Sequence, residues 1–192
     1  QTIKHEGHGP DPKRQSEAHP HFIEQTPDQQ RMFVCDLGTD EVVLYKIGEK
    51  GRLERDEENS FQLAPGSGPK KMIFTPDGKY AYVLNELSNT VCVYSYQDCQ
   101  FTFIQEIDTY PKDEYTKESL AGDIVISEKG DYLFVSNRGH DSVAAFEVDS
   151  STGKLTYIEY LDTDEKPRAM ILVNDRWLVV ASQLGGTLES FE

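Results

Sequence analysis

Pairs of apolar runs separated by a short polar turn recur along the chain. Three such segments can be laid over one another: MFVCDLGTDEVVLYKI from Met32, AYVLNELSNTVCVYSY from Ala81 and LFVSNRGHDSVAAFEV from Leu133. A fourth, LVVASQLGGTLESFE, begins at Leu178. Apolar runs rich in β-branched and aromatic residues on both sides of a polar turn are typical of two antiparallel strands. The pattern therefore predicts four strand pairs and almost no helix.

The repeats are long enough to hold several strands each. Equivalent turn positions are Asp36, Asn85, Asn137 and Ser182, which gives spacings of 49, 52 and 45 residues. A further apolar run precedes the pair, and an outer strand pattern such as KLTYIEYLDT follows it. Repeats of roughly 40 to 50 residues with several strands each are the sequence signature of propeller blades.

We therefore predict an all-β chain, a β-propeller with four-stranded antiparallel blades, of which about four are present. A β-sandwich also has many short strands and regular turns. The long period and the recurrence of the same polar turn favour the propeller. One domain or fragment is expected over residues 1–192, with approximate repeats at 22–71, 72–123, 124–170 and 171–192.

The charge balance narrows the range of partners. The chain has 19 Lys and Arg against 34 Asp and Glu, a net charge of −15. Such a field repels phosphate backbones, so we expect no nucleic-acid partner. A small anionic ligand would need a local cationic pocket. The turn SNRGHDS places Arg138 and His140 directly behind an apolar run, which makes them candidates for that pocket.

The apolar runs and the cysteines indicate the cellular compartment in which the chain is expected. No run approaches the roughly 18 apolar residues of a membrane span, and the chain starts with a polar segment, without an apolar signal region. Cys35 and Cys92 lie within apolar runs, as small core residues do. With Cys99 the chain has three cysteines, an odd and small number that fits a reducing compartment. We expect a soluble cytoplasmic chain without a membrane partner.

Four histidines lie close together near the start of the chain, at His5, His8, His19 and His21. They lack a partner Cys pair and the helical setting in which paired histidines hold zinc. The run GSGPKK has two glycines but no third and no helix behind it, so it is no dinucleotide fingerprint. We predict no metal site and no cofactor, and we expect His5 and His8 at the surface.

Several motifs together resemble one family. The runs KRQSEAHPH, VCDLGTD, PGSGPKK, YAYVLNELSNTV and VSNRGHDSVAAF are similar, in order and spacing, to the seven-bladed lactonase family. That family contains propeller-type 6-phosphogluconolactonases and fungal 3-carboxymuconate lactonizing enzymes. The resemblance covers only the later half of family members, and four units cannot close a seven-bladed ring. The chain is then a fragment, a degenerate protein or one that associates with another chain, and open strand edges would drive self-association.

The resemblance implies a site made of a His, two Arg and a Glu around a shallow central cleft. Matched by motif, these are His21 (or His19), Lys70 in place of the first Arg, Glu86, and Arg138. His21 or Glu86 would act as general acid or base, while Arg138 would hold the anionic group and Lys70 would add charge. Lysine keeps the charge of arginine but not its bidentate fork.

Further candidates for substrate binding are His19, Lys71 and His140. Lys71 stands where the family usually has a histidine, so any role of that histidine is lost. If the repeats are blades, their equivalent turns lie on one side of the molecule, which would place Arg138 and His140 across the cleft from Glu86. Each of these residues could also be an ordinary surface residue, because exposed ion pairs are common and contribute little.

The leading hypothesis is a lactonase-like hydrolase of a phosphorylated or carboxylated sugar lactone, with that small anionic lactone as its partner. One alternative is a non-catalytic propeller fragment that binds a ligand or another subunit. Another keeps the cleft but reverses the chemistry, as in a muconate-type cycloisomerase.

Overall fold

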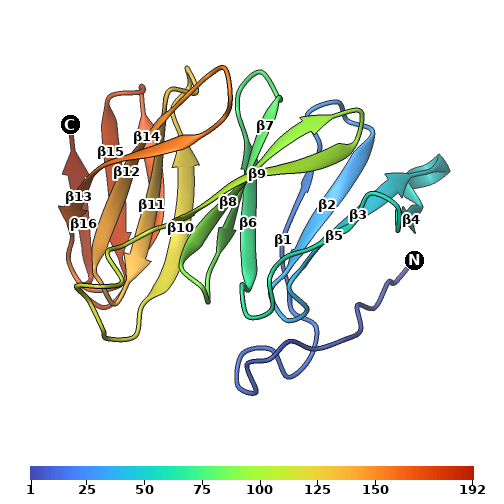
Figure 1. The fold of residues 1–192 in the computed structure, drawn as a ribbon, viewed down its shortest axis with the longest axis horizontal. Helices are drawn as coiled ribbons and strands as arrows, with labels where there is room; N and C mark the ends of the chain where they lie inside the picture. The colour runs from blue at the N-terminus through green and yellow to red at the C-terminus, as the bar shows by residue number, and fades with distance from the viewer.

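The computed structural model describes residues 1–192 as four antiparallel sheets arranged side by side in an arc. Figure 1 shows them in sequence order, from blade 1 on the right to blade 4 on the left. The all-β, partial propeller expected from the repeats is confirmed. No helix is long and apolar enough to cross a membrane.

Blades 1 and 2 contain the first nine strands. Blade 1 consists of β1 (Pro20–Gln25), β2 (Arg31–Asp36), β3 (Glu41–Ile47) and β4 (Leu53–Arg55), with the short β5 (Phe61–Gln62) also paired to β3 and a 3-10 turn η1 (Glu49–Gly51) before β4. Blade 2 consists of β6 (Pro69–Phe74), β7 (Tyr80–Asn85), β8 (Thr90–Gln97) and β9 (Gln100–Asp108).

Blades 3 and 4 contain the remaining seven strands. Blade 3 consists of β10 (Leu120–Ile126), β11 (Tyr132–Arg138), β12 (Ser142–Val148) and β13 (Leu155–Asp162). Blade 4 has three strands, β14 (Pro167–Val173), β15 (Trp177–Ser182) and β16 (Thr187–Phe191).

The predicted repeat boundaries after residues 71, 123 and 170 fall inside β6, β10 and β14, so each blade starts a few residues earlier than the sequence indicated. The reason is local. Each of these strands begins with residues that break the apolar pattern, and the pairing register shifts at that point, for example between Pro69 and Lys71. The apolar run that was visible in the sequence is only the second half of the strand.

The core lies between the blades. Tyr82 and Leu84 of β7 pack toward blade 3, whereas Ala81 and Val83 of the same strand pack toward blade 1. Both sides of the sheet are therefore buried, and β7 is apolar along its length instead of alternating. This explains why the paired strands stood out so clearly in the sequence.

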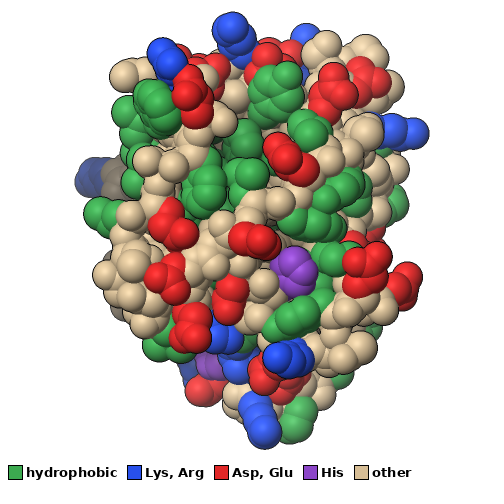
Figure 2. Space-filling view, turned by 90° about the vertical axis from the view of Figure 1, so that its left-hand side faces the viewer, with side chains coloured by type: hydrophobic (Ala, Val, Ile, Leu, Met, Phe, Trp, Pro, Cys, Tyr) green, Lys and Arg blue, Asp and Glu red, His purple; other side chains and the backbone are tan.

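The two ends of the arc differ in how they are covered. On blade 4, Ile171 is 59% exposed and Leu188 is 76% exposed, and the pairing Ile171 with Val179 and Ala181 with Leu188 puts them on one side of the sheet. Figure 2 views the molecule from this end and shows hydrophobic side chains interspersed with acidic ones. The expected self-association through such open ends stays a prediction.

On blade 1 the corresponding side is partly covered by the N-terminal segment. The side-chain amide of Gln1 exchanges two hydrogen bonds with the backbone of Leu53. The ring of His5 lies between the Asp36 carboxylate, at 2.7 Å, and the Tyr45 hydroxyl, at 2.8 Å. His5 is therefore a half-buried link in the fold, and not the free surface residue expected from the sequence.

Candidate functional site

A bulge at the start of the first strand recurs in all four blades. The pairing register shifts between Pro20 and Phe22, Pro69 and Lys71, Ala121 and Ile124, and Pro167 and Ala169. Bulges turn a side chain out of the regular alternation and are common beside active sites. The first strands of successive blades also contact each other, β1 with β6, β6 with β10, and β10 with β14. The bulged residues therefore converge along the inner side of the arc.

Three of the four bulges present a basic or imidazole side chain: His21 in blade 1, Lys70 in blade 2 and Arg168 in blade 4. In blade 3 the bulge contains Gly122. A Cβ atom added there would lie 2.4 Å from Ser136 Oγ and 2.5 Å from the Pro167 carbonyl oxygen, so no side chain fits.

Glu86 is the centre of the site. It follows β7, its backbone N–H donates to the Gly68 carbonyl (2.8 Å), and its side chain is only 2% exposed. Lys70 Nζ lies 2.5 Å and Arg138 Nη2 lies 2.8 Å from its Oε2 atom. Arg14 Nη2 pairs with the other carboxylate oxygen. One carboxylate thus joins cations from the N-terminal segment, blade 2 and blade 3.

Arg14 reaches this carboxylate because the segment before β1 is folded onto the blades. Gln15 is fully buried and donates to the Leu37 carbonyl at 2.8 Å and to Asp40 Oδ1 at 2.7 Å. Asp11 Oδ1 accepts the backbone N–H groups of Lys13 and Arg14 in a tight turn. Sequence reasoning missed Arg14, since nothing local in KRQSEAHPH indicates that it meets a residue of blade 2.

The electrostatics of the site fix the state of each group. Burial alone raises the pKa of Glu86, but the hydrogen bond and charge of Lys70, together with Arg14 and Arg138, lower this pKa to about 2. Burial lowers the pKa of Lys70 and of Arg138, while Glu86 opposes that shift in both. Glu86 is therefore a permanent carboxylate at neutral pH, and too weak a base to accept a proton from water.

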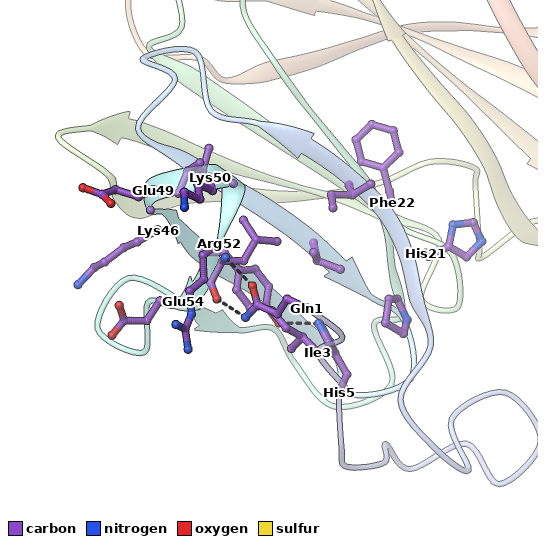
Figure 3. Close-up of a pocket in the computed structure, with 18 residues that line it drawn as sticks. Gln1, Ile3, His5, His21, Phe22, Lys46, Glu49, Lys50, Arg52 and Glu54 are labelled. Atoms are coloured by element: carbon purple, nitrogen blue, oxygen red, sulfur yellow. Dashed lines mark hydrogen bonds between the residues drawn. The ribbon is translucent and has the colours of Figure 1, made fainter.

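His21, unlike Glu86, is uncharged at neutral pH. Partial burial and the charge of Lys70 lower its pKa, and Glu86 only partly opposes them, so its ring is neutral at neutral pH. His21 lies at the edge of a hollow of about 1620 Å³, whose lining it shares with Gln1 and Arg52. Figure 3 shows the ring of His21 set apart from these two residues. That hollow lies over the open side of blade 1, and neither Lys70, Glu86 nor Arg138 lines it.

The balance of charge at the site is strongly positive. Arg14, Lys70 and Arg138 share one carboxylate, and Arg168 is close enough that its charge lowers the pKa of both Lys70 and Arg138. The Nε atom of Arg138 is buried without a hydrogen-bond partner. In a chain of net charge −15 this is a local concentration of positive charge.

The chain matches the family described as Lactonase, 7-bladed beta-propeller over residues 1–192. It belongs to this family. It is 36% identical over 192 residues to a 6-phosphogluconolactonase of Bacillus subtilis, a match that covers 98% of this chain and 54% of the relative. The chain spans about half the length of the curated relatives it matches.

Solved structures agree with this assignment. A protein from Lactobacillus plantarum superposes with a TM-score of 0.89 at 33% identity, covering 100% of this chain and 59% of the other. The periplasmic gluconolactonase PpgL of Pseudomonas aeruginosa gives a TM-score of 0.88 at 32% identity, covering 92% of this chain and 50% of the other. Both structures thus share the propeller fold of this chain over about half of their own length.

Four of the predicted residues of this lactonase-family chain lie near one another. His21, Lys70, Glu86 and Arg138 influence one another through charge or direct ion pairs. Their assignment to catalysis and binding stays a prediction. Arg14 and Arg168 join them and were not predicted.

Three predicted substrate-binding residues have other surroundings. The ring of His140 packs against Tyr110, Tyr115 and Tyr160, with centroids 5.4, 4.9 and 5.6 Å away, and its Nδ1 lies 2.7 Å from Ser142 Oγ. The expectation that His140 faces Glu86 is therefore wrong. Gly139, with φ at +125°, turns the chain between Arg138 and His140, so the two side chains diverge.

His19 and Lys71 also take part in the scaffold. His19 Nδ1 lies 2.9 Å from the Arg14 carbonyl oxygen, and its backbone N–H donates to Asp36. Lys71 pairs with Asp123 at 2.8 Å, and its Nζ lies 5.9 Å from the ring centroid of Phe22. The contacts of Lys71 join blade 1 to blade 2 and blade 2 to blade 3, whereas those of His19 join the N-terminal segment to blade 1 and leave its ring exposed. The expected binding roles of both side chains stay predictions.

The polar turns have a structural purpose of their own. Asp40, Asn89 and Asp141 occupy the same turn position with φ of 58°, 54° and 55°. Asp40 accepts the N–H groups of Gly66 and Gly68, both at 2.7 Å. Asn89 donates to the Ser119 carbonyl at 2.7 Å, and Asp141 accepts the Lys166 N–H at 2.9 Å. Each turn thus holds the segment that leads into the next blade.

The possible metal ligands and the cysteines of the chain were the next candidates for chemistry. The structure contains no group of three or more His, Cys, Asp or Glu side chains arranged to hold a metal ion. Cys35, Cys92 and Cys99 are buried and unpaired. Burial raises the pKa of the Cys92 thiol to about 11 and also raises that of Cys35, so neither is a nucleophile at neutral pH.

Proposed function

We propose that this chain carries the anion-binding centre and the general base of a hydrolase that opens a phosphorylated or carboxylated sugar lactone. The observation that carries the proposal is the cluster of Arg14, Lys70 and Arg138 around the single carboxylate of Glu86. Relatives named 6-phosphogluconolactonase and gluconolactonase support the lactonase class.

In the proposed reaction His21 removes a proton from a water molecule as the water oxygen attacks the lactone carbonyl carbon. Because burial and the charge of Lys70 lower its pKa, the imidazole is in its neutral form at neutral pH, which is the form that can accept the proton. The resulting tetrahedral oxyanion is stabilised by donors of Lys70 and Arg138. The ring C–O bond then breaks, and the imidazolium returns the proton to the leaving oxygen, which gives a hydroxy acid.

Glu86 acts in this scheme as a positioning residue. Its carboxylate orients Lys70 and Arg138 and keeps both charged in spite of their burial. This differs from the sequence-based hypothesis, in which Glu86 was one of two candidates for the general base. A pKa of about 2 leaves it no proton-accepting power at neutral pH.

The first test is the background-subtracted rate of 6-phosphogluconolactone hydrolysis by the wild type, His21→Gln, Lys70→Met and Arg138→Ala. Lys79→Met is the matched control, since Lys79 is an exposed lysine paired with Asp77 on the surface of blade 2. We expect losses of roughly 10²- to 10⁴-fold for His21→Gln, the range for one acid–base group, and no loss for the control. A wild-type rate equal to spontaneous hydrolysis would contradict the proposal for this chain.

The same variants also distinguish the proposed hydrolase from the alternative, a muconate-type cycloisomerase. That enzyme would close a carboxylated muconate to a lactone, so turnover of a muconate with no hydrolysis of sugar lactones would favour it. A chain that binds 6-phosphogluconate without turning over either substrate would instead be a binding module.

A further inference from the structure

Arg168 holds a distinctive place among the cations of the site. It is the bulged residue of β14, between the pairs Pro167 with Ser182 and Ala169 with Ala181. Lys70 holds the equivalent position in β6, between the pairs Pro69 with Asn85 and Lys71 with Leu84. Because a bulge at the same point turns both side chains the same way, Arg168 faces the inner side of the arc as Lys70 does.

The start of β14 is packed directly against the arginine of blade 3. The Cβ position on Gly122 lies 2.5 Å from the Pro167 carbonyl oxygen and 3.4 Å from Arg138 Cγ. The absence of a side chain at Gly122 lets the β14 bulge approach blade 3 beside Arg138. Consistent with this closeness, the charge of Arg168 disfavours the protonated forms of both Lys70 and Arg138.

Arg168 differs from its neighbours in having no acidic partner. Arg14, Lys70 and Arg138 all pair with Glu86, whereas no ion pair or side-chain hydrogen bond involves Arg168, which is exposed. Its guanidinium is thus a free bidentate donor beside a centre that already has more positive than negative charge. Planar forks of this kind match the oxygens of a phosphate.

We propose that Arg168 binds the phosphate group of the substrate and thereby makes the site specific for phosphorylated over uncharged sugar lactones. This inference rests on the proposed function for its substrate. Lys70 and Arg138 meet the reacting carbonyl, while Arg168 meets the distant dianion. A dianionic phosphate compensates the surplus positive charge more completely than a single carboxylate does.

The test compares kcat and KM for 6-phosphogluconolactone and for uncharged gluconolactone in the wild type, Arg168→Met and Arg168→Lys. Arg176→Met is the matched control, an exposed arginine of the same blade that pairs with Glu192. We expect Arg168→Met to raise KM for the phosphorylated lactone about 10- to 100-fold, the effect of losing a charge-assisted hydrogen-bond pair. Its KM for gluconolactone and its kcat should change little, and Arg168→Lys should be intermediate.

An equal rise of KM for both lactones, or no rise for either, would overturn the assignment of Arg168. If the wild type hydrolyses neither lactone, the readout becomes binding of inorganic phosphate and 6-phosphogluconate by titration calorimetry. Binding by the wild type and by Arg176→Met that is lost in Arg168→Met would uphold the phosphate site although the lactonase proposal had failed. Binding that is absent in the wild type, or unchanged in Arg168→Met, would sink the inference.

Discussion

Gly122 of blade 3 and Pro167 of blade 4 lie so close together that a Cβ atom on Gly122 would be 2.5 Å from the Pro167 carbonyl oxygen. The same Cβ position would be 2.4 Å from Ser136 Oγ and in ordinary contact, at 3.4 Å, with Arg138 Cγ. The missing methyl group therefore decides how closely blades 3 and 4 approach beside Arg138.

Gly122→Ala is expected to destabilise the fold and to impair the site together. The new methyl group would collide with the Pro167 carbonyl oxygen, which cannot move aside as a flexible side chain would. We expect a cost of about 1 to 3 kcal/mol, as for other overpacked positions, visible as a lower midpoint in urea unfolding. Gly48→Ala is the control, because its Cβ would meet only the Arg52 carbonyl oxygen, at 3.2 Å. Equal midpoints for wild type and Gly122→Ala would contradict the steric argument.

The ion cluster should make stability depend on pH through Glu86. Its pKa in the folded chain, about 2, lies below its ordinary value of 4.5. The stabilisation is thus fully present above pH 4.5 and is lost as the pH falls from 4.5 toward 2, and its size is roughly 3 kcal/mol.

Urea unfolding of wild type and Glu86→Gln between pH 6 and pH 2.5 measures this contribution. The gap between the two proteins should be widest at pH 6 and should close on acidification. Glu128→Gln, at an exposed position of blade 3, should track the wild type throughout. A gap that does not depend on pH would mean that Glu86 stabilises the fold by packing and not through its charge.

The pKa of His21 should respond to its neighbour. The charge of Lys70 lowers this pKa, so removing the charge in Lys70→Met should move it upward toward the ordinary value. Titration of the imidazole carbon protons by NMR measures the shift without requiring activity. The control Lys79→Met should leave the titration of His21 where it is in the wild type, and a downward move in Lys70→Met would contradict the proposed proximity.

His140 should matter for stability and not for turnover. Its ring contacts three tyrosines, so His140→Ala should cost about 1 to 3 kcal/mol at the usual contribution of aromatic pairs. Its rate of lactone hydrolysis should stay within about twofold of the wild type, in contrast to His21→Gln. Loss of activity in a folded His140→Ala variant would contradict this prediction and show that His140 contributes to turnover.

Self-association is expected through the apolar side of blade 4. Light scattering of the wild type should show a mass that grows with concentration, because apolar patches of this kind favour association. The double variant Ile171→Lys, Leu188→Glu should lower that mass, whereas Ile158→Lys, at an exposed position of β13, should not. If the wild type is monomeric at every concentration, the predicted self-association is wrong.

The fold was predictable because both sides of the paired strands are buried, so β7 and β8 appear in the sequence as almost continuous apolar runs. The blade boundaries were not predictable in the same way, because the bulged residues interrupt that pattern. One signal was present, however. A proline precedes the bulged residue in Pro20-His21, Pro69-Lys70 and Pro167-Arg168, and aligning these three pairs would have drawn attention to Arg168.

The site could be predicted only where motifs carried it. Glu86, Lys70 and Arg138 lie in recognisable turns and strand ends, whereas Arg14 depends on how buried Gln15 anchors the N-terminal segment. That path is a property of tertiary contacts. The error at His140 has a backbone origin, since the left-handed φ of Gly139 separates two side chains that are neighbours in the sequence.

The carboxylate of Glu86 has one further consequence. Any anion that approaches Lys70 or Arg138 meets cations that already have a partner, so Glu86 behaves as an internal competitor of the ligand. Ring opening adds a carboxylate to the substrate, and an unopposed cluster of cations would hold that product more tightly than the lactone. In the proposed reaction, Glu86 keeps part of the positive charge engaged and so favours release of the product.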